Sequence, residues 1–424
     1  VINNWFDNLV KRIDAIDKGS GLNCQQKQAA VVELQAEFED QGPKRMDEVK
    51  RFAGQVLEFV NNLDAQQVEE QMKSIERRYN DIGKRLQRKL QILDMTRKGI
   101  DDTRNEIENA RDWVKDRYSE LQRPPPLGFE SRKAEDKLGA LKGLLKEADN
   151  KLVLKETLMK RVGNMTNELE PPEQQQLESA LRNLGTEQEQ LVEKIKSEID
   201  RVNAAANTRR NLEQNLEKAK AWLKAKNAEI HKLSGYLPLK ARQVEEEIAQ
   251  HNIHENEIKE FNEGDLNDLL KLGSSVLKEC DDKDRERLQA LLDEVKEEYE
   301  TLTGESQQKI NALSDLLQGR RQFETDIDKC INWLKQAEVA TASDIRAPNI
   351  EVLEEQLAKY ETLGNEAKRV QGDIDKICEQ GKAINPTISE ADKLILNETL
   401  TNMKDRHNRI SALIPDRTNA LKQN

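Results

Sequence analysis

The sequence predicts an all-α protein built from tandem three-helix coiled-coil bundles, which continuous helices join into an extended rod. Charged residues make up 35% of the chain and aromatic residues only 4%, a balance typical of long helices and coiled coils. The four tryptophans of the chain recur at a nearly fixed period. Proline is missing from the three stretches that lead from one period into the next, so each stretch can form one uninterrupted helix.

Two series of residues define the period. The tryptophans recur at nearly equal steps, at Trp5, Trp113, Trp222 and Trp333. A second mark follows each tryptophan about two thirds of a period later, at Tyr79, Gln188, Tyr299 and His407. The interval from a second mark to the next tryptophan is identical in all three cases: 79 to 113, 188 to 222 and 299 to 333. A fixed period indicates stacked copies of one structural unit, and constant spacing across its boundary places the insertions elsewhere.

Each period predicts three helices, which we call A, B and C. Helix A carries the tryptophan within an apolar stripe at spacings of three to four residues, as in Leu212, Leu216 and Ala219 before Trp222. Helix B carries a second stripe. Helix C contains the second mark and continues into helix A of the next period. The sequence also predicts where helix C starts, with Pro171 in a first turn and Asp281 and Ser389 as N-caps.

A helix with one apolar stripe cannot bury it alone, whereas three antiparallel helices can. Helices of about 30 residues give bundles ~45 Å long. We therefore predict four units, the first of which has a shortened helix A because the chain starts only four residues before Trp5. Their predicted boundaries are 1–99, 100–208, 209–319 and 320–424.

This pattern resembles the spectrin repeat, most clearly in the helix A segments Asn109–Trp113 and Lys218–Leu223. Because the second mark is Tyr, Gln or His instead of tryptophan, the chain is more similar to the rods of nesprins, dystrophin and spectraplakins, and among these to nesprins. The resemblance implies a cytoplasmic, cytoskeleton-associated tether that works with actin or microtubule systems, with the nuclear envelope as one place of attachment.

Three groups of residues are candidates for structural roles. Gly99 and Gly319 stand at the same offset before Trp113 and Trp333 and are expected to act as junction hinges, because glycine frees a helical backbone. Pro43 and Pro415 are expected to kink or interrupt their helices. The expected core anchors are the aromatic residues of the two series, Trp5, Trp113, Trp222, Trp333, Tyr79 and Tyr299.

Charge is unevenly distributed. Residues 71–98 carry a net charge of +6 and residues 279–300 a net charge of −6. The basic stretch could dock an anionic partner, or its charges could simply solvate an exposed helix face. The candidate docking face consists of Arg77, Arg78, Lys84, Arg85, Arg88 and Lys89. The overall charge of −12 argues against nucleic acid as a partner.

The sequence contains no indication of catalysis or of a cofactor. No phosphate-binding loop, nucleophile elbow or Cys–His pairing is present. His251 and His254, beside Glu255 and Glu257, have helical spacing for a metal, but no third ligand group is evident, so a solvated polar face is the favoured interpretation. The four cysteines lack paired spacing, which fits reduced thiols in an intracellular protein. No apolar run approaches the ~20 residues of a membrane span.

The sequence therefore favours a structural function, an elastic spacer that bears load through thin cores. The alternative is a binding module that docks actin, an anionic membrane or a partner rod through charged helix faces. We expect the chain to be monomeric at physiological salt, because exposed ion pairs are weak and few aromatic residues remain for an interface.

Overall fold

The computed structural model describes residues 1–17, 19–232 and 235–423. The predicted all-α fold is confirmed, since the described residues contain long helices and no strand. A π-helical turn, η1, covers Asn262–Leu266, and a short 3-10 helix, η2, covers Asn385–Thr387. The α-helices are α1 Ile2–Asp14, α2 Cys24–Leu57, α3 Asn62–Gln122, α4 Ser131–Asn164, α5 Pro171–Lys232, α6 Ala241–Phe261, α7 Asn267–Leu277, α8 Asp282–Ala342, α9 Ile350–Ile384 and α10 Glu390–Lys422.

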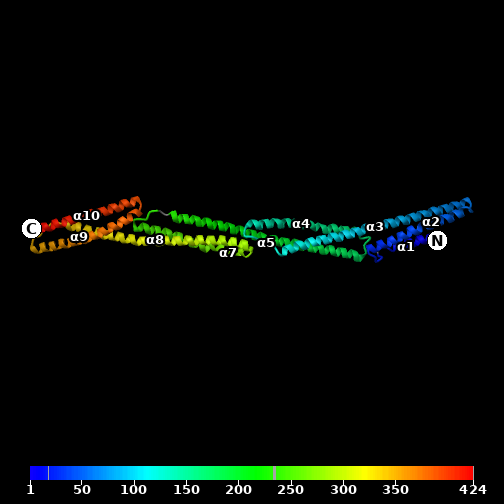
Figure 1. Ribbon diagram of the computed structural model, residues 1–424, viewed down its shortest axis with the longest axis horizontal. Coiled ribbons are helices and arrows are strands. Elements are labelled where there is room, and N and C mark those ends of the chain that lie inside the picture. Colours follow the sequence, from blue (N-terminus) through cyan, green and yellow to red (C-terminus); the bar gives the residue numbers. More distant parts are fainter. Residues whose placement is uncertain (18, 233–234, 424) are drawn as a thin grey trace. The chain divides into compact units, whose positions relative to one another are not determined.

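The chain forms two compact units, residues 1–207 and residues 208–424. In the first unit, the first bundle consists of α1, α2 and the N-terminal part of α3. The second bundle consists of the C-terminal part of α3, α4 and residues 171–207 of α5. In the second unit, the third bundle consists of residues 208–232 of α5, α6, α7 and the N-terminal part of α8. The fourth bundle consists of the C-terminal part of α8, α9 and α10 (Figure 1).

Side-chain caps fix the starts of several helices. The side chains of Asp281 and Ser389 accept hydrogen bonds from the amides of Asp284 and Asp392 at 2.8 and 3.2 Å, so both predicted N-caps are confirmed. Helix α5 begins at Pro171, as predicted. An N-cap satisfies an amide that the helix itself leaves unpaired.

Helices α3, α5 and α8 are 61, 62 and 61 residues long and run without a break through the predicted boundaries. No proline lies inside them beyond the first turn of α5. Each of these helices therefore serves as helix C of one bundle and as helix A of the next.

Two prolines lie inside helices that continue through them. Pro43 lies within α2 and Pro415 within α10. Of the two expected outcomes, interruption does not occur at either site, and a kink at either site stays a prediction. The sequence did not predict η1, where a wider turn between α6 and α7 accommodates an extra residue.

An aromatic layer forms the middle of the first and third bundles. Phe38 of helix B stacks on Trp5 and on Tyr79, with ring centroids 6.0 and 4.7 Å apart. In the third bundle, Phe261 occupies the same place, 4.1 Å from Trp222 and 6.5 Å from Tyr299. The two series of marks are thus joined through a phenylalanine of helix B.

The same layer is polar in the second and fourth bundles. Gln188 donates a hydrogen bond to the backbone carbonyl of Lys151 at 3.0 Å, and the ammonium of Lys151 lies 4.7 Å from the ring centroid of Trp113. Nε2 of His407 donates to the carbonyl of Ala367 at 2.8 Å. A buried polar side chain needs such a partner, so helix B supplies a carbonyl where helix C lacks tyrosine.

The tryptophans differ in burial. Trp5 is 9% exposed, whereas Trp113, Trp222 and Trp333 are only partly buried. The indole N–H groups of Trp5 and Trp333 point outward and donate to Glu37 and Glu366 at 3.4 and 3.0 Å. Three of the four tryptophans therefore cover the edge of a core and do not fill its centre, and their importance as anchors stays a prediction.

Trp5→Ala should destabilise the first bundle by about 3–5 kcal/mol, because it removes a large buried side chain and leaves a cavity against Phe38. Urea unfolding, with amide exchange assigned to α1 and α2, would measure the loss. Val32→Ala is the control, since Val32 of α2 is 48% exposed and should change stability little. Equal effects of the two substitutions would contradict the prediction.

Candidate functional site

The basic stretch of α3 is divided between two faces of the helix. On one face, Arg78 pairs with Asp7, Arg85 with Asp14, and Lys89 with Asp17. Successive basic residues lie about two helical turns and then one turn apart along α3, and their aspartate partners have nearly the same spacing. The three ion pairs therefore form a ladder between helices C and A. Half of the predicted docking face is therefore engaged within the first bundle.

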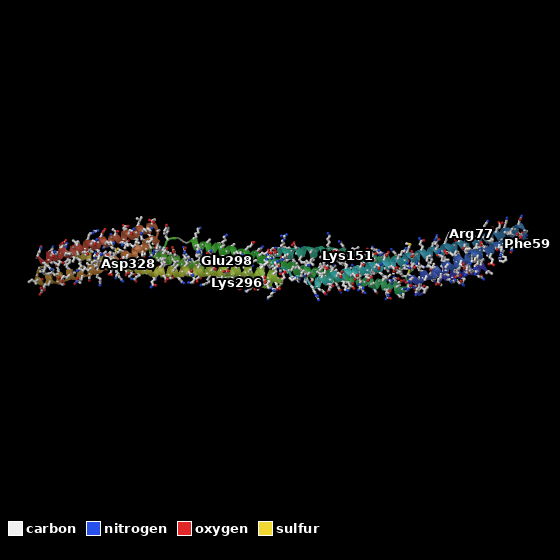
Figure 2. All side chains as sticks on the ribbon, in the orientation of Figure 1. Phe59, Arg77, Lys151, Lys296, Glu298 and Asp328 are labelled. Atoms are coloured by element: carbon white, nitrogen blue, oxygen red, sulfur yellow. The ribbon has the colours of Figure 1, made fainter. Side chains whose placement is uncertain are left out.

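The other three basic residues form a separate stripe. Arg77, Lys84 and Arg88 are each offset by one residue from the ladder, which is about 100° around the helix. All three are exposed, and the structure gives them no ion pair within its described residues. These three side chains are the ones available to an anionic partner, and we call them the basic stripe. Figure 2 shows Arg77 on α3, well away from the turn at Phe59.

A buried ion pair links the first and second bundles. Nζ of Lys27, at the start of helix B, lies 2.9 Å from Oε1 of Glu170, and the Lys27 side chain is 0% exposed. Lys27 also donates to the carbonyl of Glu168 at 3.3 Å. Hydrogen bonding by Lys27 holds the pKa of Glu170 below its usual value, although burial opposes this effect. The turn before helix C of one bundle is thereby attached to the preceding bundle.

The loop between α1 and α2 is shaped for this contact. Gly19 and Gly21 have φ values of +96° and +76°, a conformation that favours glycine. The Gly19 amide donates to Oε1 of Glu170 at 2.9 Å, and the Cys24 amide donates to Oε2 of Glu173 at 3.2 Å. The loop therefore presents backbone donors to the carboxylates of the second bundle.

A corresponding contact joins the third and fourth bundles. Nε of Arg320, which is 5% exposed, donates to the carbonyl of Pro238 at 2.9 Å. The Leu237 amide donates to the carbonyl of Thr387 at 2.8 Å, and the Ala241 amide donates to Glu324 at 3.0 Å. Again the loop between helices A and B binds the turn before helix C of the next bundle and the helix beside it.

Sequence reasoning missed these buried cations. Arg209 is 0% exposed and pairs with Glu279 at 3.0 Å. It stands at the same offset before Trp222 as Arg320 does before Trp333. The signal that could have revealed them is an arginine at a fixed offset on the apolar stripe. A charge at such a position needs a partner when buried.

The two predicted hinge glycines have different surroundings. Both lie inside continuous helices, Gly99 in α3 and Gly319 in α8. A Cβ at Gly99 would come within 2.6 Å of the Met165 sulfur, whereas a Cβ at Gly319 would meet nothing within 4 Å. A close approach of the end of α4 accounts for glycine at 99, while hinge roles at both sites stay predictions.

Gly319→Ala should stabilise the helix around residue 319 by roughly 0.5–1 kcal/mol, because alanine restricts the unfolded backbone and fits the helix. Gly99→Ala is the matched variant and should gain less, since Met165 must move. Amide exchange in α8 and α3 would report both effects. A larger gain at Gly99 than at Gly319 would show that the packing argument fails.

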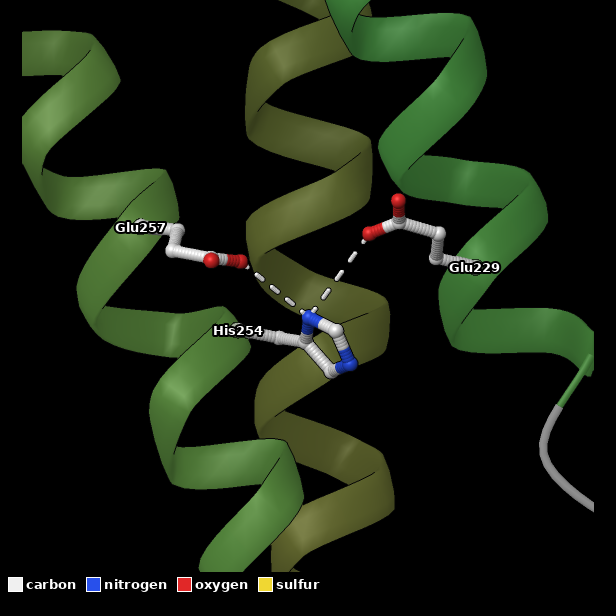
Figure 3. Close-up of side chains that lie close together, drawn as sticks. All are labelled: Glu229, His254 and Glu257. Carbon is white, nitrogen blue, oxygen red and sulfur yellow. Dashed lines mark hydrogen bonds and ion pairs between the residues drawn. The ribbon is translucent and has the colours of Figure 1, made fainter.

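A polar cluster in the third bundle brings His254 between two carboxylates (Figure 3). Its Nδ1 lies 3.3 Å from Glu257 and 3.9 Å from Glu229, so the structure supplies the third group that the sequence did not reveal. However, the Lys226 ammonium lies 2.6 Å from Glu257 and 2.5 Å from Glu229. Lysine thus occupies the place between the carboxylates that a metal ion would need, and the residues do not fit a metal site.

His251 is the opposite case, a buried histidine without a partner. It is 1% exposed, and neither ring nitrogen has a hydrogen bond among the described residues. Burial lowers its pKa, and the positive charges of Lys309 on α8 and His254 on α6 lower it further. His251 is therefore mainly neutral in the folded bundle at pH 7.

The third bundle should lose stability as the pH falls below about 6.5, the ordinary pKa of histidine. The pKa of His251 is lower in the folded chain than in the unfolded chain, so as the pH falls the unfolded chain is protonated first. Protonation favours the unfolded chain, and the stabilisation present at higher pH is lost. Amide exchange of α6 at pH 7 and at pH 5, corrected for intrinsic rates, would measure this effect. His251→Leu should reduce the pH dependence, and an unchanged dependence in that variant would rule out His251 as its source.

The four cysteines are free and buried. Burial raises the pKa of the Cys24 and Cys330 thiols to about 11. These thiols stay protonated at neutral pH and are poor nucleophiles. No helix in the described chain combines the length and apolarity needed to cross a bilayer.

Three-helix bundles that share their long helices, with polar loop contacts between the first and second bundles and between the third and fourth, define a helical repeat protein. Residues 318–423 match the family model described as "Spectrin repeat". The chain belongs to the spectrin-repeat family.

The chain is also similar to much longer proteins. It is 47% identical over 420 residues, or 99% of its length, to Muscle-specific protein 300 kDa of Drosophila melanogaster, and it spans 3% of that protein. It is 20% identical over 349 residues to Microtubule-actin cross-linking factor 1 of Rattus norvegicus, covering 81% of this chain and 6% of that protein. Isoforms 6/7 of that factor in Mus musculus share 20% identity over 351 residues, covering 82% and 10%.

Proposed function

We propose that the chain consists of four spectrin-type repeats, 1–99, 100–208, 209–319 and 320–424, that form a rod and act as an elastic spacer in a cytoskeletal linker protein. The main support is that α3, α5 and α8 run uninterrupted through the proposed boundaries. A helix shared by two bundles carries tension from one core to the next without a flexible linker. The names of the relatives, which refer to muscle and to cross-linking of microtubules and actin, agree with this role.

A single-molecule pulling experiment on the whole chain tests this proposal. If the four repeats unfold one at a time, each event should lengthen the chain by roughly 300–350 Å, because ~109 extended residues replace a bundle ~45 Å long. If the two compact units are the cooperative elements, steps of roughly 600–700 Å are expected instead. Gradual extension without discrete steps would contradict a spacer made of folded repeats.

The finer proposal is that the parent protein is cytoplasmic and attaches the cytoskeleton to the nuclear envelope. It rests on the nesprin-like character of the sequence. Imaging of the tagged full-length protein would test it, since a nuclear rim is expected and a distribution that avoids the nucleus would oppose it. We also propose that the chain is a monomer at physiological salt, which light scattering after size exclusion would establish.

A second candidate function, docking of an anionic filament or membrane, is favoured by the basic stripe. Replacing Arg77, Lys84 and Arg88 together by Glu should abolish co-sedimentation with F-actin or with anionic vesicles, whichever binds. Binding by the parent should weaken as salt screens these charges. The substitutions should leave stability nearly unchanged because the three side chains are exposed.

The control for this experiment carries the same change of charge elsewhere. Lys142, Lys146 and Lys160 are exposed residues of α4, and replacing them by Glu should leave binding intact. If both triple variants lose binding equally, overall charge is responsible and the basic stripe is not a specific site.

A further inference from the structure

A run of three prolines is exposed on the loop that joins α3 to α4. Residues 124–126 are all proline and follow Arg123, the C-cap of α3, and all four of these residues are exposed. The run is flanked by Leu121 and Leu127, which are 5% and 8% exposed and belong to the core of the second bundle. Buried residues on both sides therefore hold the prolines at the surface. We call residues 123–126 the proline segment.

Local steric constraints fix the shape of the proline segment. The pyrrolidine ring holds φ of each proline near −65°, and a proline also disfavours the helical conformation for the residue before it. Pro124 and Pro125 each precede another proline, so both are restricted to the extended polyproline II conformation. This conformation has three residues per turn. Residues 124–126 therefore form one turn of a polyproline II helix before any partner binds.

The polar groups of the proline segment are not engaged in the described part of the chain. Proline has no amide hydrogen to donate, and no carbonyl of residues 123–126 accepts a hydrogen bond from a described residue. The guanidinium of Arg123 forms no ion pair with a described residue. The carbonyl oxygens and the positive charge of the segment are therefore available to a partner.

The junction contacts do not account for the three prolines. In the third bundle, Leu237 and Pro238 bind the fourth bundle through backbone groups. Leu237 lies four residues before the start of α6, and Leu127 lies four residues before the start of α4. Residues 124–126 precede the position of Leu127, so they have no counterpart among these junction residues.

We propose that the proline segment is a binding site for a small protein domain of the WW class, whose groove is lined by aromatic side chains and bordered by a carboxylate. The pyrrolidine rings would pack on the aromatic rings, and the cost in entropy is low because the polyproline II turn is already formed. The carboxylate would pair with Arg123. A tryptophan N–H or tyrosine O–H of the groove would donate to a carbonyl of the segment.

The length of the segment distinguishes between domains that bind this conformation. SH3 domains bind two prolines separated by two other residues. The residue three positions after Pro124 is Leu127, which is not a proline and is packed in the core. The single exposed turn instead fits a groove that binds adjacent prolines, and Arg123 favours a groove of negative charge. This binding function is independent of the elastic role of the chain, so its test involves no applied force.

The experiment measures fluorescence anisotropy of dye-labelled domains as the whole chain is added. The probes are purified WW domains that span the ligand preferences of their class, with SH3 domains for comparison. At least one WW domain should bind. Replacing residues 124–126 together by alanine should weaken its binding about tenfold or more, a loss of ~1.4 kcal/mol. Pro348→Ala is the matched control, because Pro348 is a single exposed proline in the loop between α8 and α9, and it should leave binding unchanged.

A second variant separates recognition from stiffening of the loop. Arg123→Glu keeps all three prolines, and it should leave the fold intact because Arg123 is exposed. It should weaken binding, and replacing the groove carboxylate of the bound domain by lysine should restore it. The proposal is overturned if no WW domain binds, if only SH3 domains bind, or if the alanine variant binds as tightly as the parent. Altered melting of the alanine variant without any binding would assign the prolines to stiffening alone.

Discussion

The long helices of the described chain each have an apolar stripe, and the need to bury three such stripes against one another is the constraint on which the rest depends. The constraint fixes the register between helices at the layer that contains the tryptophan. Where helix C supplies Tyr79 or Tyr299, helix B supplies a phenylalanine. Where helix C supplies Gln188 or His407, helix B supplies a backbone carbonyl. The layer varies in chemistry but keeps its position, and in both polar versions a side-chain N–H of helix C is paired with a backbone carbonyl of helix B.

The junctions attach one bundle to the next, and they use polar contacts in addition to apolar ones. They use buried cations held by carbonyls and carboxylates, as in Lys27 with Glu170 and Arg320 with the Pro238 carbonyl. Burying an ion pair brings little net stability, since desolvation offsets attraction, but losing one partner is strongly destabilising. Such contacts therefore favour one arrangement of loop and turn over others. Apolar packing would be more tolerant of sliding along the helix.

Much of the fold could be predicted from the sequence because its signals are local and periodic. The tryptophan spacing, the proline-free stretches and the caps at Asp281 and Ser389 each depend on residues close together in the chain. The sequence left open whether α2 and α10 continue through Pro43 and Pro415, because packing of the whole helix can outweigh the loss of one hydrogen bond. The η1 turn was missed because an extra residue in a helix leaves no signal in the composition.

The candidate sites were less predictable because they depend on contacts between distant residues. A run of basic residues predicts a charged helix, but the division of that run into a ladder and the basic stripe depends on Asp7, Asp14 and Asp17. Similarly, the spacing of His251 and His254 gave no reason to expect Lys226 between the nearby carboxylates. Only the partner helix decides which charges are engaged within the bundle.

The cores also bear on how the first two bundles respond to load. One apolar cluster runs from Ile2 and Phe6 of α1 to Leu181 and Leu184 of α5, and thus crosses the boundary between these bundles. Unfolding the first bundle would expose Leu158, Val162 and Leu169 of the second, which belong to the same cluster. Each exposed side chain of this size costs roughly 1.5–3 kcal/mol, a substantial share of the stability of a small domain. The first and second bundles are consequently coupled by shared burial as well as by the helix they share, so the stability of each contributes to the folded state of the other.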